Sequence, residues 1–424
     1  MRLAPGTPLR LSLRQDLSVP DRAVGLLAMA GQRAALEWAP ALLADPLPVS
    51  PLFYPLESGL IEARGSHFGG LHGFLADSLP EGWGVRLWQR RLARHGLNWA
   101  MLSPVEQLAL VGEGGRGALV YAPATTPPDD AAALDLDALA ADARAMLLGD
   151  DCHLSDMLAT LGGASGGARP KINVGFVADG RICIDEAEPS SEIAQAPGYS
   201  SWIVKFPALA DPVDMGPLEQ AYATMARAAG VTMAETRLIP ARQGPAFFAS
   251  RRFDRPAPGQ RRHMVSLAGA TEAPPDRPSL DYDGFLRATR AITRHDGDVG
   301  EAFTRMVFNI LACNRDDHTR QHAYLMDPAG HWRLAPAYDL TWSEGAGGEH
   351  MLAIEGEGRC PTRAIVRRLG QRHGFSLASI DAIIDRVRAA VANWPLHAAD
   401  AGVGPSLRLV AARLATIDRD FVGS

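Results

Sequence analysis

Residues 309–325 read NILACNRDDHTRQHAYL, and they place a dense group of polar side chains directly after an apolar stretch with helical spacing. A solvated helix end is one explanation of the two acidic residues, Asp316 and Asp317. The other explanation is a catalytic loop, because phosphoryl transfer from ATP needs a carboxylate that orients the acceptor hydroxyl and oxygen ligands for Mg²⁺. Asp316 and Gln321 have side chains suited to these two tasks.

A further carboxylate follows 23 residues after Asp316, in the stretch LAPAYDLTW at residues 334–342. Asp339 lies there between a proline and an apolar run, where a hairpin would bring a second magnesium carboxylate to the site. A single aspartate in such a place is more often a turn cap. The interpretation as a metal ligand therefore depends on the order of several motifs along the chain.

A glycine-rich stretch, LGGASGGARPK at residues 161–171, precedes both acidic motifs. Glycines allow backbone N–H groups to approach phosphate oxygens, and Lys171 or Arg169 adds positive charge. The stretch matches neither GxxxxGK[ST] nor GxGxxG, so a flexible turn without a ligand is the alternative.

Two charged residues lie between the glycines and the acidic cluster. Lys205 is part of the strand-like sequence WIVKF, and Glu219 belongs to the helical stretch that follows. A lysine inside an apolar strand costs free energy unless a carboxylate or a phosphate receives it. Protein kinases have the same order of motifs along the chain: a glycine loop, a strand lysine, a helix glutamate, a catalytic aspartate and a metal-binding aspartate. The H-R-D and D-F-G motifs are missing, so the sequence does not fit an ordinary eukaryotic-type kinase.

The remaining pattern predicts an α+β fold with two lobes, like that of protein kinases. Residues 9–27 alternate apolar and polar positions and favour a small antiparallel sheet. Short strands follow, and helices dominate after about residue 254. The expected later elements are strands at 171–177, 181–184, 202–206, 236–239 and 246–253, a helix that starts at Pro217, and helices at 299–313, 376–394 and 406–421.

The length of the chain favours more than one lobe. Its 424 residues exceed the roughly 250–300 residues at which a single core stops growing. The stretch PATTPPDDAAA, residues 123–133, has no apolar period and is the best linker candidate. We therefore expect a β-rich N-terminal subdomain (1–125), a kinase N-lobe with the glycine loop and Lys205 (126–255), and a helical C-lobe with the catalytic and metal-binding loops (256–424).

Composition excludes several classes of function. The net charge of −6 gives no general attraction to nucleic acid or to anionic membranes. Four cysteines stand far apart without a CxxC pair, which argues against a zinc site and a disulfide framework. The start of the chain lacks the apolar core of a secretory signal, and no run of about 18 apolar residues is free of charge. The expected compartment is the cytoplasm, without membrane contact.

These motifs together resemble the HipA family of bacterial serine/threonine kinases, which are the toxins of type II toxin–antitoxin systems. The resemblance extends over roughly residues 1–420. The matching segments are SGGARPK (165–171), WIVKF (202–206), RFDR (252–255), NRDDH (314–318), PAYD (336–339) and, near the N-terminus, DSLPEGWG (77–84).

The resemblance implies a role for each matching residue. Asp316 is the expected catalytic aspartate. His318 is the expected histidine of the catalytic loop beside the nucleotide, with a purely structural histidine as the alternative. Asp339 is the expected Mg²⁺ ligand, and Lys205 is the expected phosphate-holding lysine. The other expected nucleotide-binding residues are Gly166, Gly167, Ala168, Arg169 and Lys171 of the glycine loop, Arg251, Arg252 and Phe253 beside the adenine, and Tyr338.

One departure from the family pattern concerns Gln321, because the family usually has asparagine as the second ligand on the magnesium side. Glutamine keeps the amide oxygen but is one methylene longer, so the metal geometry is either preserved with a small shift or lost.

Two hypotheses follow: an active ATP-dependent protein serine/threonine kinase, or a nucleotide-binding pseudokinase or partner-binding module without turnover. A third, a metal-dependent phosphoesterase built on Asp316, Asp317 and His318, lacks a second clustered His/Asp motif.

The resemblance also implies cofactors and partners. ATP and Mg²⁺ are the implied cofactors, aminoacyl-tRNA synthetases are the implied acceptor proteins, and a HipB-type helix-turn-helix antitoxin is the implied partner. Because the net charge is acidic, we expect DNA to be contacted only indirectly, through such an antitoxin.

Overall fold

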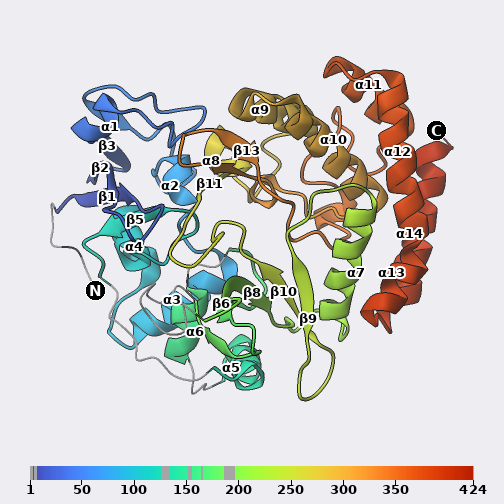
Figure 1. Ribbon diagram of the computed structural model, residues 1–424, viewed down its shortest axis with the longest axis horizontal. Helices are drawn as coiled ribbons and strands as arrows, with labels where there is room; N and C mark the ends of the chain where they lie inside the picture. The colour runs from blue at the N-terminus through green and yellow to red at the C-terminus, as the bar shows by residue number, and fades with distance from the viewer. Residues whose placement is uncertain are drawn as a thin grey trace.

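Three antiparallel sheets and a large group of helices build the molecule (Figure 1). The computed structural model describes residue 3 and residues 7–125, 134–150, 155–163, 166–185 and 196–423. Most of the predicted linker, residues 126–133, lies outside the described residues. Sheets occur mainly in the first part of the chain and helices in the last, which confirms the α+β prediction.

The first sheet has the strand order β4-β3-β2-β1-β5. In β1, Leu9, Leu11 and Leu13 are buried and Arg10 between them is exposed, because side chains alternate between the two faces of a strand. The elements of this part are β1 Leu9–Leu13, β2 Arg22–Ala30, β3 Arg33–Trp38, α1 Pro40–Ala44, β4 Leu60–Glu62, α2 Gly73–Ala76, α3 Gly82–Ala93, α4 Pro104–Val111 and β5 Leu119–Ala122.

The second sheet has the order β7-β6-β8-β10-β9 and contains all the strands predicted between residues 171 and 253. Helix α7 packs on β9 and β10, and it begins at Met215 and not at the predicted Pro217. Proline is tolerated there because the N–H groups of a helix's first turn have no partner within the helix. The elements are α5 Leu136–Leu148, α6 Ser155–Gly162, β6 Lys171–Phe176, β7 Ile182–Ile184, β8 Ser200–Lys205, α7 Met215–Ala228, β9 Thr236–Ile239 and β10 Phe247–Arg251.

The last part combines a small sheet, β11-β12-β13, with helices. The three predicted helices are present, although Trp394 belongs to a separate helix whose first turn contains Pro395. Within the described ranges, no helix is both long and apolar enough to cross a membrane. The elements are β11 His263–Ser266, α8 Leu267–Thr271, α9 Tyr282–Thr293, α10 Asp296–Leu311, β12 Ala323–Met326, β13 Trp332–Leu334, α11 Arg363–Arg372, α12 Leu377–Ala392, α13 Trp394–Ala401 and α14 Ser406–Val422.

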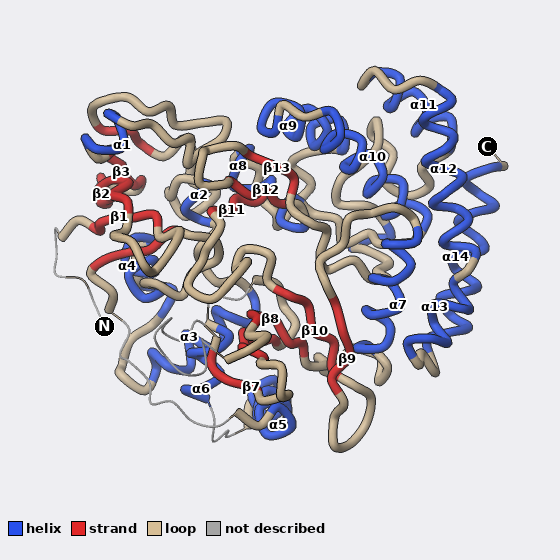
Figure 2. Tube along the Cα trace, in the orientation of Figure 1, coloured by secondary structure: helices blue, strands red, loops and turns tan. Residues whose placement is uncertain are grey.

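The described residues form two large apolar cores and a small third cluster around Trp88 and Trp99. The larger core runs from Leu9 in β1 to Phe421 in α14, so the first sheet and the last helices share one interior. The smaller core lies under the second sheet, which Figure 2 shows between α5 and α6 on one side and α7 on the other. Trp83 and Leu87 of α3 are members of this smaller core. A helix from the first 125 residues therefore supports the sheet that carries Lys205.

Candidate active site

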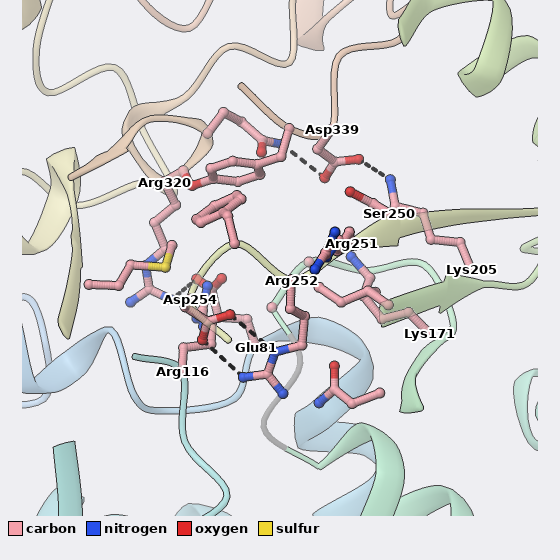
Figure 3. A pocket seen from close by; sticks show the side chains of 18 of the residues that line it. Glu81, Arg116, Lys171, Lys205, Ser250, Arg251, Arg252, Asp254, Arg320 and Asp339 are labelled. Carbon is pink, nitrogen blue, oxygen red and sulfur yellow. Dashed lines mark hydrogen bonds and ion pairs between the residues drawn. The ribbon is translucent and has the colours of Figure 1, made fainter. Parts of the chain in front are cut away.

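A cleft lies where the three parts of the chain meet, and Figure 3 shows the side chains that line it. Ala168, Arg169 and Asp316 are the predicted site residues that do not line this cleft. The predicted residues that do line it are Gly166, Gly167, Lys171, Lys205, Arg251, Arg252, Phe253, His318, Gln321, Tyr338 and Asp339.

Lys205, the last residue of β8, contacts carboxylates on two other elements. Its Nζ lies 3.0 Å from Oε1 of Glu219 on α7, and it also contacts Oδ1 of Asp339. Burial opposes the charge of the ammonium group, but Asp339 and Glu219 outweigh this effect and raise the pKa of Lys205. The strand lysine thus has the carboxylate partners that its burial requires.

Lys171 faces Lys205 directly. It is the first residue of β6, and its Cα is paired with that of Lys205 in the register of β6 and β8. Directly opposed residues share one face of a sheet, so both ammonium groups point to the same side. Burial lowers the pKa of Lys171. Among the residues that the structure describes, none accepts a hydrogen bond from its Nζ. An anion between the two lysines would relieve both the burial and the repulsion.

The glycine loop is held against the start of α3. Gly167 has φ +77°, a left-handed conformation that favours glycine, and its carbonyl oxygen accepts a hydrogen bond from Trp83 N at 2.9 Å. A Cβ atom on Gly82 would lie 2.5 Å from the same carbonyl oxygen, so the close approach requires glycine at position 82. Gly166 and Gly167 are thereby fixed at the edge of the cleft.

Arg169 and Ala168 lie beside the cleft. The Arg169 guanidinium binds carboxylates of the protein, with Nε 3.0 Å from Oδ1 of Asp211 and Nη1 3.4 Å from Oε1 of Glu219. Ala168 is exposed at the bend of the loop. In this arrangement Arg169 links the glycine loop to the glutamate that also contacts Lys205.

Asp339 combines an unusual backbone with an unusual charge environment. Its φ is +56°, which is rare for a residue other than glycine and typical of functional sites. Burial opposes ionisation, but Lys205 and Lys171 hold the pKa of Asp339 well below its usual range. Gln321 Nε2 donates a hydrogen bond to Asp339 Oδ2 at 3.3 Å. The β12–β13 hairpin brings these two residues together.

A metal at this point would have few protein ligands. In the described part of the chain, no three His, Cys, Asp or Glu side chains form a group that could hold a metal ion. Asp339 and the amide oxygen of Gln321 are the adjacent oxygen donors. Mg²⁺ often binds in this way, because it takes one or two protein carboxylates and completes its shell with water and substrate phosphates.

Asp316 lies beside His318, which lines the cleft. The Asp316 side chain is 59% exposed, and its Oδ1 lies 3.9 Å from Nε2 of His318. Partial burial and the charge of Asp339 raise the pKa of Asp316, while His318 opposes the rise and solvent limits it. His318 Nδ1 accepts a hydrogen bond from Arg320 N at 3.2 Å. His318 therefore has a structural contact as well as a place in the cleft lining.

Asp317, the next residue after Asp316, points into the protein. It is fully buried, with Oδ2 2.7 Å from the hydroxyl of Tyr282 and 2.8 Å from Nδ1 of His350, and its Oδ1 accepts a hydrogen bond from Met351 N. The two neighbouring aspartates thus lie in opposite environments. Asp317 secures the segment that follows Asp339 against the catalytic loop. The buried Asp317 is therefore unable to join Asp316 and His318 in the metal site of the phosphoesterase hypothesis.

Arg251 and Arg252 line the cleft, but their guanidinium groups bind protein carboxylates. Nη1 of Arg251 lies 3.0 Å from Oε2 of Glu235. Arg252 is buried, with Nη1 2.8 Å from Asp185 and Nη2 2.9 Å from Asp254. These residues shape the wall of the cleft, and their charges are already compensated.

Aromatic and aliphatic side chains also line the cleft. The ring centroids of Phe253 and Tyr338 lie 5.6 Å apart. The Tyr338 hydroxyl donates a hydrogen bond to the carbonyl oxygen of Arg320 at 2.5 Å, which holds the ring in place. Further apolar lining residues are Ile203, Phe248 and Met264.

Four charged residues of the cleft were not predicted: Glu81, Arg116, Asp254 and Arg320. Arg116 has buried Nε and Nη2 atoms without a hydrogen-bond partner in the described part of the chain. Arg320 is an ion-pair partner of Glu81. The place of Glu81 in the DSLPEGWG segment was an available signal, whereas no local pattern distinguishes Arg116 from other arginines.

Two family models match this chain. The HipA-like C-terminal domain matches residues 163–394, and the HipA N-terminal domain matches residues 16–122. The chain is similar to HipA of Shewanella oneidensis MR-1, solved as a complex with HipB and operator DNA. That similarity has 17% identity and a TM-score of 0.69, and it covers 97% of this chain and 96% of that one.

A second solved structure, the proinflammatory kinase CtkA of Helicobacter pylori, has 13% identity and a TM-score of 0.36. The aligned region covers 53% of this chain and 88% of the CtkA chain. No match was found among curated proteins.

The fold defines an α+β protein with a β-rich N-terminal part and a helical C-terminal part, and it is shared with the S. oneidensis structure. More particularly, the match to the HipA-like C-terminal domain spans more than half of the chain, and the N-terminal domain matches separately. The chain belongs to the HipA family.

Proposed function

We propose that this protein is an ATP-dependent protein serine/threonine kinase of the HipA toxin type, which transfers the γ-phosphate of Mg-ATP to a protein hydroxyl and so inhibits growth. The contact of Lys205 with both Glu219 and Asp339 carries the proposal. It joins a strand lysine and a candidate metal ligand of the cleft to a buried helix glutamate behind them, as protein kinases do around the nucleotide phosphates.

The described residues suit ATP and Mg²⁺. Lys171 Nζ is a buried cation without a hydrogen-bond acceptor among the described residues, and a phosphate would supply one. Gly166, Gly167, Lys171 and Lys205 would hold the phosphates, while Asp339 and Gln321 would hold the metal. Bound Mg²⁺ neutralises phosphate charge and fixes the orientation of the phosphates.

We assign the orientation of the acceptor hydroxyl to the carboxylate of Asp316. Its side chain is 59% exposed and lies beside His318 of the cleft lining, so a serine or threonine of another protein could reach it. Glu219 keeps the ammonium group of Lys205 in the phosphate site. The rings of Phe253 and Tyr338 would exclude water from the base.

A nucleotide-binding pseudokinase, or a partner-binding module without turnover, is the second candidate, and Gln321 favours it. The amide of Gln321 donates to Asp339 Oδ2 at 3.3 Å, so its nitrogen faces the candidate metal ligand. The amide must rotate before its oxygen faces a metal, and the extra methylene changes where that oxygen lies.

The proposed acceptor and partner come from family membership. An aminoacyl-tRNA synthetase is the proposed acceptor class, and a HipB-type antitoxin is the proposed partner, through which operator DNA would be contacted. The S. oneidensis structure contains HipA with HipB and operator DNA, which supports a partner of this kind. The proposed compartment is the cytoplasm.

The test is transfer of labelled γ-phosphate from Mg-ATP into a host lysate, with the unaltered protein compared with Asp316→Asn. We expect a discrete labelled band only with the unaltered protein, and equal ATP binding by both forms. Equal labelling by the Asp316→Asn form would refute the role of Asp316. ATP binding without transfer by the unaltered protein would favour the pseudokinase.

A further inference from the structure

The segment DSLPEGWG, residues 77–84, lies where the glycine loop and the catalytic loop approach each other. Glu81 lines the cleft opposite the lysine and Asp339 side, and Figure 3 shows it near Arg116 and Asp254. The segment belongs to the N-terminal subdomain, which contains none of the predicted nucleotide or metal ligands. Its contacts nevertheless reach both loops of the cleft.

On one side, Glu81 binds the catalytic loop through Arg320. The carboxylate contacts Nη1 of Arg320, whose side chain is only 8% exposed, and Oδ1 of Asp77 lies 3.8 Å from Nε of the same arginine. Burial opposes ionisation of Glu81, but Arg320 and Arg116 lower its pKa. Removal of Glu81 would leave the buried charge of Arg320 without this partner, which is costly, although the Glu81 side chain itself is 29% exposed.

Arg320 in turn contacts the residues proposed to act in phosphoryl transfer. Its backbone N–H donates to His318 Nδ1 at 3.2 Å, and its carbonyl oxygen accepts a hydrogen bond from the Tyr338 hydroxyl at 2.5 Å. Gln321 and Asp339 are the next residues along the chain from Arg320 and Tyr338. The position of Arg320 therefore affects both sides of the candidate metal site.

On the other side, the residues that follow Glu81 bind the glycine loop. Trp83 N donates to the Gly167 carbonyl at 2.9 Å, and Trp83 Nε1 donates to the Lys171 carbonyl at 3.1 Å. Gly82 permits this contact, since a Cβ there would lie 2.8 Å from the Cα of Ala168. Three consecutive residues thus contact both ends of the loop and, through Glu81, the catalytic loop.

We propose that Glu81 is a positioning residue that sets the catalytic loop relative to the glycine loop, so that the N-terminal subdomain is an integral part of the active site. This inference rests on the proposed kinase function for its effect on rate, but the contact itself is independent of turnover. The alternative is an ion pair that only stabilises the packing of the subdomain.

The experiment is a double-mutant cycle with Glu81→Gln, Arg320→Gln and the pair, and it has two readouts. In transfer assays we expect each single variant to lower kcat by roughly 10- to 100-fold while KM for ATP changes by less than about threefold, because misplaced groups slow the chemical step more than binding. We expect the double variant to be no slower than the slower single variant, since both changes break one contact.

The second readout is hydrogen exchange of the amides of Trp83 and Gln321, which donate to the carbonyls of Gly167 and His318. We expect Glu81→Gln to increase exchange at both amides. Glu62→Gln is the matched control, because Glu62 makes an exposed ion pair with Arg33 at 2.8 Å within the same subdomain. It should change neither readout. Glu81→Asp keeps the charge and should give an intermediate loss of kcat. It replaces Glu81→Gln in both readouts if that variant does not fold.

Several results would overturn the proposal: full or increased activity of Glu81→Gln, additive losses in the cycle, or losses of rate that follow thermal stability alone. Unchanged exchange at both amides would also overturn it. If the unaltered protein binds ATP but transfers no phosphate, the proposed function fails, and the exchange readout still decides whether Glu81 couples the two loops.

Discussion

Lys171 and Lys205 lie directly opposite each other on neighbouring antiparallel strands, and they are the two lysines of the chain. All other residues in the total of 42 Lys+Arg are arginine. Opposed like charges destabilise a sheet, and Asp339 and Glu219 compensate the charge of Lys205 but do not offset the burial of Lys171. A compact ammonium group binds phosphate as a point charge where a guanidinium fork would not fit. The pair of opposed lysines therefore favours an anion between them and costs some stability without one.

Because the chain has two lysines, an amine-reactive acylating reagent should label few sites. Burial lowers the pKa of Lys171, whereas carboxylates raise that of Lys205, so we expect Lys171 to react first near neutral pH. Mg-ATP should protect it. Peptide mass spectrometry measures the label at each position, and Lys171→Met is the control. Preferential labelling of Lys205, or no protection by Mg-ATP, would contradict this assignment.

Replacement of Asp339 by asparagine should abolish the magnesium dependence of ATP binding. The change also removes the carboxylate that contacts Lys205, so we expect the free energy of unfolding to fall by about 1–3 kcal/mol. Calorimetric titration of ATP with and without Mg²⁺, and urea unfolding, measure the two effects. Asp296→Asn is a matched control, because that side chain is 91% exposed. Magnesium-dependent binding by Asp339→Asn would exclude Asp339 as the ligand.

Replacement of Gln321 by asparagine should preserve or increase transfer, whereas Gln321→Ala should lower it by roughly 10-fold or more, because only alanine removes the amide oxygen. The apparent affinity for Mg²⁺ should follow the same order. Initial rates measured across a magnesium titration test both statements. Equal rates for the alanine variant and the unaltered protein would show that position 321 does not hold the metal.

Stability should fall as the pH is lowered from 7 to 5. Burial lowers the pKa of both His72 and His263 to about 4, so in this range the unfolded chain binds protons that the folded chain does not. The contribution of these histidines is fully present above about pH 6.5. By pH 5 each should have lowered the free energy of unfolding by about 2 kcal/mol. Urea unfolding at the two pH values measures the difference.

The histidine prediction has internal controls. The variants His72→Gln and His263→Gln should each show a smaller loss of stability between pH 7 and 5. His331→Gln should not, because the His331 side chain is 78% exposed. An unchanged pH dependence in both buried variants would mean that other groups cause the acid sensitivity.

Local sequence was enough to predict the elements around the site. The hairpin of β6 and β7, the strand with Lys205 and the helix with Glu219 all follow from short periodic patterns and turn residues, which act over a few positions. The order of these elements predicted a kinase-like α+β fold. The fold and the family are confirmed, whereas the role of each site residue stays a prediction.

Packing decided which charges meet. Asp316 and Asp317 are adjacent and equivalent in sequence, yet one is exposed at the cleft and the other is fully buried against His350. Arg169, expected at the nucleotide, binds Asp211 instead, and Glu81 reaches Arg320 from another subdomain. Hydrophobic periodicity is a local property that shows in the chain itself. Ion pairs between distant residues depend on how separate parts of the chain dock, and therefore only the tertiary structure reveals them.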